Sequence, residues 1–137
     1  MYVLDTNVVS ATRVPARNPK VADWLRGVNG IDVYVTAITI AEIEQGIRLK
    51  ERDDATQGKI LRDWFEQRVI PAFVTTNRVL DFNTRAARIY GKYPIPESAP
   101  KDDALIAAIA AANGMMVVTR NVKHFEPLGV PVINPWE

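Results

Sequence analysis

The sequence contains no cysteine and only one histidine, His124, among its 137 residues. The absence of cysteine excludes disulfides, thiolate metal sites and cysteine nucleophiles. A single histidine excludes metal sites built from several imidazoles and leaves few ways to assemble a serine–histidine–aspartate triad. Any metal chemistry in this chain must therefore use mainly oxygen ligands, which favours Mg²⁺ or Mn²⁺ over Zn²⁺.

The sequence also lacks a large excess of charge of either sign, and it has no long hydrophobic run. Seventeen basic and 16 acidic side chains give a formal net charge of +1, so the chain lacks the field of a strongly basic nucleic-acid binder. No apolar run approaches the length that spans a bilayer, and the first residues do not follow the signal-peptide pattern. We therefore expect a cytoplasmic protein that does not bind membranes.

The hydrophobic pattern alternates between strand-like and helical segments, with no linker or internal repeat. Short apolar runs predict strands at residues 2–4, 33–35, 116–119 and 131–133. Amphipathic patterns predict helices at residues 18–28, around 40–47, at 60–65 with an end at Pro71, at 79–90 and at 102–113. This alternation predicts an α/β fold in which residues 1–137 form a single three-layer domain with a central parallel sheet flanked by helices.

Polar residues follow several of these strands or begin the helices after them. Asp5 follows the first strand, Glu42 begins the helix after the second, Asp103 begins the alanine-rich helix, and Asn121 follows the strand at 116–119. Functional sites of parallel α/β sheets lie at the carboxyl ends of the strands, so we expect these four side chains to meet there.

Three carboxylates and one amide are ligands that suit Mg²⁺ or Mn²⁺. Without a cation, two carboxylates about 4 Å apart would repel each other by roughly 4 kcal/mol at an effective dielectric constant near 20. A divalent cation relieves that repulsion, lowers the pKa of a bound water and stabilises negative charge in the transition state. The expected reaction is hydrolysis of a phosphodiester.

Each of these residues also fits a purely structural role. Glu42 fits a capping box in which Thr39 is the N-cap residue. Asp5 suits an N-cap, Asp103 suits the positive end of a helix dipole, and Asn121 suits a turn. Individually the signals are weak, so the functional hypothesis rests on their joint placement.

Other polar and aromatic residues carry weaker signals. His124 fits a surface or hydrogen-bonding residue better than a general base. The basic residues are typical of solvated helix faces, although a subset could line a groove for a phosphate backbone. The larger aromatic side chains, which recur at helical spacing, are interpreted as core: Trp24, Trp64, Phe65 and Phe82.

Four segments together resemble the motifs of PIN-domain ribonucleases. Residues 2–10 (YVLDTNVVS) resemble the first motif and residues 36–46 (TAITIAEIEQG) the second. Residues 103–108 (DALIAA) resemble the third motif and residues 118–125 (VTRNVKHF) the fourth. The tail, residues 129–136 (GVPVINPW), is similar to the end of VapC and FitB-type toxins. The resemblance covers essentially the whole chain, and the order and spacing of the motifs are specific to that family.

The resemblance implies a PIN fold and a Mg²⁺-dependent or Mn²⁺-dependent endoribonuclease that is the toxin of a type II toxin–antitoxin pair. It assigns Asp5, Glu42 and Asp103 as metal-binding acids and Thr119 as a supporting hydroxyl. It also implies a homodimer that is neutralised by a cognate antitoxin and that meets operator DNA only through that antitoxin.

The sequence departs from the family pattern at two positions. Asn121 stands where many members have a fourth acid, so one Mg²⁺ is the expected metal count. His124 stands where members often have an acid before the phenylalanine.

Two alternative functions remain open. One is a catalytically weak PIN-like binding protein that acts through its antitoxin and DNA complex. The other is an aspartyl-nucleophile phosphatase using Asp5, although position 7, where that chemistry usually has a second carboxylate, is Asn7.

Overall fold

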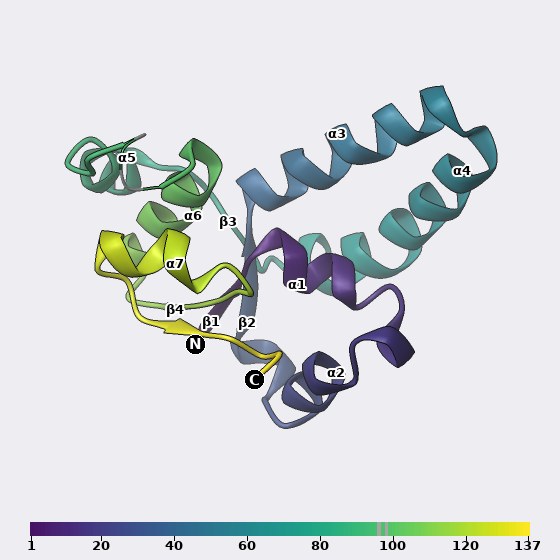
Figure 1. The fold of residues 1–137 in the computed structure, drawn as a ribbon, viewed down its shortest axis with the longest axis horizontal. Helices are drawn as coiled ribbons and strands as arrows, with labels where there is room; N and C mark the ends of the chain where they lie inside the picture. The colour runs from purple at the N-terminus through teal and green to yellow at the C-terminus, as the bar shows by residue number, and fades with distance from the viewer. Residues whose placement is uncertain (96, 98) are drawn as a thin grey trace.

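A parallel sheet forms the centre of the fold (Figure 1). The structure is a computed structural model that describes residues 1–95, 97 and 99–137. Within these residues the sheet has five strands, which are β1 (Tyr2–Leu4), β2 (Val33–Thr36), β3 (Val79–Leu80), β4 (Met116–Val118) and β5 (Val132–Ile133). Their order is β3-β2-β1-β4-β5, and every neighbouring pair is parallel. From β1, the chain adds β2 and β3 on one side of the sheet and then crosses over to add β4 and β5 on the other side. The topological switch point therefore lies between β1 and β4.

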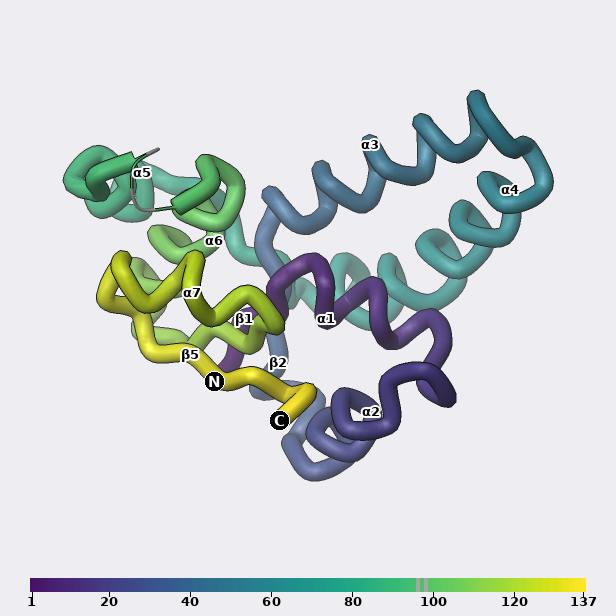
Figure 2. Tube along the Cα trace, in the orientation of Figure 1, coloured from purple at the N-terminus to yellow at the C-terminus, as the bar shows by residue number. Residues whose placement is uncertain are grey.

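Helices connect the strands and cover the sheet (Figure 2). They are α1 (Thr6–Ala11), α2 (Pro19–Arg26), α3 (Ala37–Asp53), α4 (Ala55–Trp64), the π-helix η3 (Phe65–Val74), α5 (Thr84–Tyr90), α6 (Lys101–Ala112) and α7 (Val122–Phe125). Short 3₁₀ turns are η1 (Pro15–Arg17), η2 (Gly30–Asp32) and η4 (Glu126–Leu128). Among the described residues, no helix is both long and apolar enough to cross a membrane.

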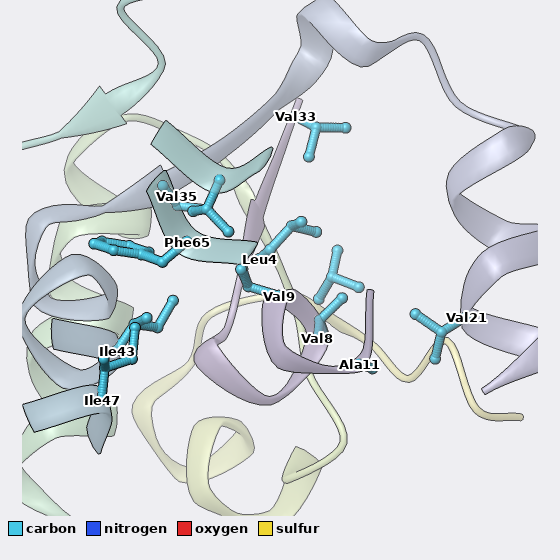
Figure 3. Packing of buried hydrophobic residues seen from close by; sticks show 12 residues of the cluster. Leu4, Val8, Val9, Ala11, Val21, Val33, Val35, Ile43, Ile47 and Phe65 are labelled. Atoms are coloured by element: carbon cyan, nitrogen blue, oxygen red, sulfur yellow. The ribbon is translucent and has the colours of Figure 1, made fainter. Parts of the chain in front are cut away.

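The strand side chains alternate between two cores, one on each face of the sheet. Leu4 and Val118 point to a core that they share with α1, α2, α3 and η3, and Figure 3 shows side chains of these helices gathered around Leu4. Val3 and Val117 point the other way, against α6 and α7. These two cores confirm the predicted three-layer α/β architecture, with a sheet buried on both faces.

The predicted helix at 79–90 is wrong in its first part. Val79 and Leu80 form β3, because their backbone pairs in parallel with Val35 and Thr36 at the open edge of β2. The helix begins only after Asn83, whose side chain caps it by accepting a hydrogen bond from the Ala86 N–H at 3.0 Å. Phe82, predicted to be core, therefore lies outside a helix and is 38% exposed.

The predicted end of a helix at Pro71 is also wrong. The helical path continues through Pro71 to Val74 as η3. A π-helix has hydrogen bonds that span five residues, as the bond from Thr75 N–H to the Ile70 carbonyl does at 3.0 Å. The wider turn accommodates a proline that an α-helix interior would not tolerate without a kink.

Helices α3 and α4 form a long hairpin that projects from the sheet (Figures 1 and 2). Arg62 on α4 forms ion pairs with Glu44 and Glu51 on α3, which tie the two helices together. Gly58 permits their close approach, since a Cβ built on it would lie 2.5 Å from the Glu51 Cα. The backbones therefore meet where no side chain fits.

Gly58→Ala is expected to reduce the free energy of unfolding by about 1–3 kcal/mol, because the added methyl group forces the two backbones apart. Gly46→Ala on the exposed face of α3 is the matched control, since its Cβ would meet nothing within 4 Å. That change is expected to stabilise the protein by about 0.5–1 kcal/mol. Urea unfolding measures both, and equal effects of the two changes would contradict this packing.

Candidate acidic active site

The site begins where β1 and β4 end, next to each other. Asp5 directly follows β1 and Thr119 directly follows β4, and the Asp5 N–H donates to the Val118 carbonyl at 2.9 Å. These positions lie at the topological switch point, at the carboxyl edge of the sheet. Open α/β sheets bind ligands at this location.

The Asp5 carboxylate is buried and accepts three hydrogen bonds. Its Oδ1 accepts from the Thr6 N–H at 2.8 Å, which makes Asp5 the N-cap residue of α1 as one interpretation predicted. Its Oδ2 accepts from the Thr119 hydroxyl at 2.7 Å and from the Asn7 side-chain amide at 3.2 Å. Asp5 is only 3% exposed, so these donors replace the water that a surface carboxylate would have.

Glu42 reaches the same edge from α3. The Thr6 hydroxyl donates to Glu42 Oε1 at 2.6 Å and lies 3.0 Å from the Thr39 hydroxyl. The predicted capping box is wrong, because α3 begins immediately after β2 and its N-cap is Thr36, whose hydroxyl accepts from the Thr39 N–H. Glu42 therefore lies beyond the first turn, where its carboxylate meets α1 and not the end of its own helix.

Asp103 lies in the first turn of α6 and contacts the only histidine. Its Oδ2 is 2.6 Å from His124 Nδ1, so His124 is a hydrogen-bonding residue, as predicted. Asp103 is largely buried, whereas the neighbouring Asp102 is exposed. Asn121 joins the site through its backbone, since its N–H donates to the Thr119 hydroxyl oxygen at 2.9 Å.

The three acids influence one another electrostatically. Burial raises the pKa of Asp5, the Asp103 carboxylate raises it further, and the Thr119 hydroxyl and Thr6 N–H oppose both effects. Burial also raises the pKa of Glu42, with added repulsion from Asp102, Asp5 and Asp103 and an opposing hydrogen bond from Thr6. Carboxylates from three distant segments of the chain thus share one electrostatic environment.

The PIN domain family model matches residues 2–127. This chain belongs to the PIN domain family. It is 54% identical over 77 residues to ribonuclease VapC14 of Mycobacterium tuberculosis, a match that covers 56% of this chain and 75% of the relative. It is 34% identical over 141 residues to the toxin FitB of Neisseria gonorrhoeae, covering 99% of both chains. It also superposes with a TM-score of 0.86 and 34% identity on a chain in the structure of FitAB bound to an IR36 DNA fragment, covering 100% of this chain and 96% of that one.

The acidic side chains of this PIN site have the oxygen donors that a hard divalent cation requires. A carboxylate has about four acceptor positions, and the described hydrogen bonds use three on Asp5 and one each on Glu42 and Asp103. Oxygen lone pairs therefore remain for a cation. Within the described part of the chain, however, no three acidic or histidine side chains are gathered around one point closely enough to form a ligand cage. The donor types fit, and the acids are neighbours but not a preassembled cage.

The sequence analysis assigned no role to Thr6, which links Asp5 to Glu42, or to Asn7, which contacts Asp5 in this PIN domain. Both follow Asp5 directly and lie within the first PIN-like motif, residues 2–10. In the structure Thr6 holds Glu42 and Asn7 holds Asp5. Their signal was available, since side chains in the first turn after a strand lie at the edge where functional groups gather.

If RNA cleavage is measured as a function of pH, Thr119→Val is expected to shift the acidic limb of the rate profile to higher pH. The hydroxyl lowers the pKa of Asp5, so its loss raises that pKa further, and Asp5 becomes protonated at a pH where it is ionised in the wild type. The free energy of unfolding is expected to fall by about 1–3 kcal/mol, because the Asn121 N–H also loses its acceptor. Thr119→Ser keeps the hydroxyl and should restore the profile. A shift of the limb to lower pH in Thr119→Val would contradict this assignment.

Proposed function

We propose that this chain is a metal-dependent endoribonuclease that acts as the toxin of a type II toxin–antitoxin pair. The observation that carries the proposal is the placement of Asp5 and Glu42 at the carboxyl edge of a PIN-domain sheet, where Thr6 donates hydrogen bonds to both carboxylates. The nearby Asp103 carboxylate raises the pKa of each of them. The names of its relatives, ribonuclease VapC14 and toxin FitB, support the same activity and the same biological role.

Asp5, Glu42 and Asp103 are the residues that would hold the metal. A bound Mg²⁺ or Mn²⁺ supplies positive charge for the phosphodiester transition state and makes water a stronger nucleophile. Asn121, an amide where many PIN proteins have an acid, adds no charge, so we propose a single Mg²⁺.

Three neighbours keep the carboxylates in place. The Thr119 hydroxyl fixes the orientation of Asp5, and the Thr6 hydroxyl fixes that of Glu42. His124 restrains Asp103 through the hydrogen bond to Oδ2. Such supporting contacts matter because outer-shell residues of metal sites typically contribute about 10–100-fold in affinity or activity.

The proposed partners follow from the same family relationship. We infer a cytoplasmic homodimer, with residues 1–137 as one PIN domain, whose substrate is RNA and whose acidic site is blocked by a cognate antitoxin. Contact with operator DNA would occur only through the antitoxin. The structure of FitAB bound to an IR36 DNA fragment, one chain of which this chain resembles, supports both partners.

Cleavage of purified total RNA by this chain, alone and saturated with its cognate antitoxin, tests the proposal. Cleavage by the free protein that stops in the complex is the expected result. Undiminished cleavage in the saturated complex would contradict the toxin–antitoxin assignment. Antitoxin binding by a folded chain that cleaves no RNA would favour the alternative of a catalytically weak binding protein.

A further inference from the structure

An arginine whose guanidinium lies over a tryptophan ring is found beside the acidic site. Arg120 directly follows Thr119, is exposed, and places its guanidinium carbon 5.0 Å from the centroid of the Trp136 ring. The indole N–H of Trp136 donates to Asn18 Oδ1 at 3.2 Å. The aromatic ring is thereby anchored to the start of α2, and the arginine rests on an anchored surface.

Asn7 connects this arginine to the acidic centre. Its side-chain amide donates to Asp5 Oδ2 at 3.2 Å, and its Oδ1 accepts from the Arg120 N–H at 3.4 Å. The backbone at Arg120 is thus two hydrogen bonds away from the buried carboxylate.

A groove of about 530 Å³ lies on this side of the site. Arg120, Asn121, Lys123 and His124 line it, and His124 is also hydrogen-bonded to Asp103. The groove therefore opens next to the acids. Two acidic residues, Glu126 and Glu137, also contribute to its lining.

Despite those acids, the Arg120 guanidinium has no ion-pair partner within the described residues, in contrast to Arg62, which contacts Glu44 and Glu51. A contact between a guanidinium and an aromatic ring is not a hydrogen bond to another side chain, so the five N–H groups of the planar fork stay available for other acceptors. That planar fork matches two oxygens of a phosphate. An arginine that is oriented by such a contact loses little side-chain entropy when it binds such a group.

We propose that Arg120, oriented by Trp136, binds a phosphate of the RNA next to the one that is hydrolysed. The inference rests on the proposed ribonuclease function and adds the residue that positions the substrate backbone. Arg120 contributes to substrate binding through the groove, while the acids carry out the chemistry. The RNA enters along the wall formed by residues 120–124.

RNA binding in the presence of a chelator tests Arg120 separately from cleavage. The probe is a fluorescent single-stranded oligoribonucleotide of about 20 nucleotides, and its Kd is measured by anisotropy over a range of salt concentrations. Arg120→Gln is expected to raise Kd about tenfold and to reduce the slope of log Kd against log salt by about 0.7, the value for one phosphate contact on a single strand. Arg88→Gln on α5, also exposed, is the matched control and should change neither quantity.

Two further variants separate orientation from charge. Arg120→Lys retains the charge but not the planar fork, so it should recover only part of the affinity. Trp136→Phe keeps an aromatic surface and should bind RNA more tightly than Trp136→Leu, with thermal melts confirming that both fold. In cleavage assays Arg120→Gln should raise KM and leave kcat nearly unchanged.

The possible outcomes are distinct. Equal Kd and equal salt slope for Arg120→Gln and the wild type would overturn the proposal, as would absence of RNA binding by the wild type. A variant that loses antitoxin affinity but keeps RNA affinity would show that Arg120 binds a protein carboxylate instead. Binding that depends on Arg120 in a wild-type chain that cleaves no RNA would refute the ribonuclease function and leave the phosphate contact intact.

Discussion

Asp5→Asn is expected to reduce RNA cleavage by about 100-fold or more, a larger loss than outer-shell changes at metal sites produce. Asparagine has the size of aspartate and is an equally good N-cap residue, so α1 should still begin at the same position. What the variant loses is the charge and one oxygen acceptor. That acceptor is Oδ2, which takes hydrogen bonds from Thr119 and Asn7.

The stability of the same variant provides an independent check. Burial raises the folded-state pKa of Asp5, so its electrostatic contribution to stability is present at low pH and is lost as the pH rises through that raised pKa. At neutral pH the ionised carboxylate therefore lowers the free energy of unfolding, and Asn removes that electrostatic penalty. The loss of charge in Asp5→Asn should therefore not lower Tm. Asp63→Asn, which changes a surface carboxylate paired with Lys59, is the control for both assays. Wild-type cleavage by Asp5→Asn would exclude Asp5 from the site.

Chelation is expected to stop cleavage completely, and Mg²⁺ or Mn²⁺ should restore it while raising Tm. The physical reason is repulsion, because the Asp103 carboxylate raises the pKa of Asp5 and Glu42, and a cation held by these acids would offset that repulsion. At a free cation concentration 100 times its Kd, the added stability is about 2.7 kcal/mol. Thermal melts with and without the cation measure this gain.

The metal experiment has two controls, which are a monovalent salt at the same ionic strength and the variant Asp103→Asn. Sodium chloride at matched ionic strength should not reproduce the increase in Tm, because screening of surface charges is not site binding. Asp103→Asn should lose most of the increase, since it removes one of the three charges. A cleavage rate that is unaffected by chelator would refute metal dependence.

The sheet and the position of the site could be predicted because they depend on local patterns. Apolar runs placed four of the strands, and the rule that functional groups gather at carboxyl ends directed attention to Asp5, Glu42 and Asp103. The strand missed was β3, which has two residues and whose formation depends on pairing with β2. Tertiary pairing decides the structure of so short a segment, and its sequence cannot distinguish an edge strand from the start of a helix.

The finer details of the site required the three-dimensional structure. The predicted cap at Thr39 failed because the length of β2 decides where α3 begins, and β2 ends at Thr36. The contact of Thr6 with Glu42 joins residues 36 positions apart, and that of Thr119 with Asp5 joins residues 114 apart. Such contacts depend on how the helices pack, which hydrophobic periodicity alone does not determine.

The most direct test of the central claim is cleavage of purified total RNA by antitoxin-free protein, with Mg²⁺, Mn²⁺ or EDTA, beside Asp103→Asn and Asp102→Asn. The two aspartates differ in their surroundings, because Asp103 lies against His124 whereas Asp102 is exposed. The account predicts cuts that require the metal, disappear in Asp103→Asn and persist in Asp102→Asn. Cuts that persist in EDTA, or that Asp103→Asn makes as fast as the wild type, would contradict it.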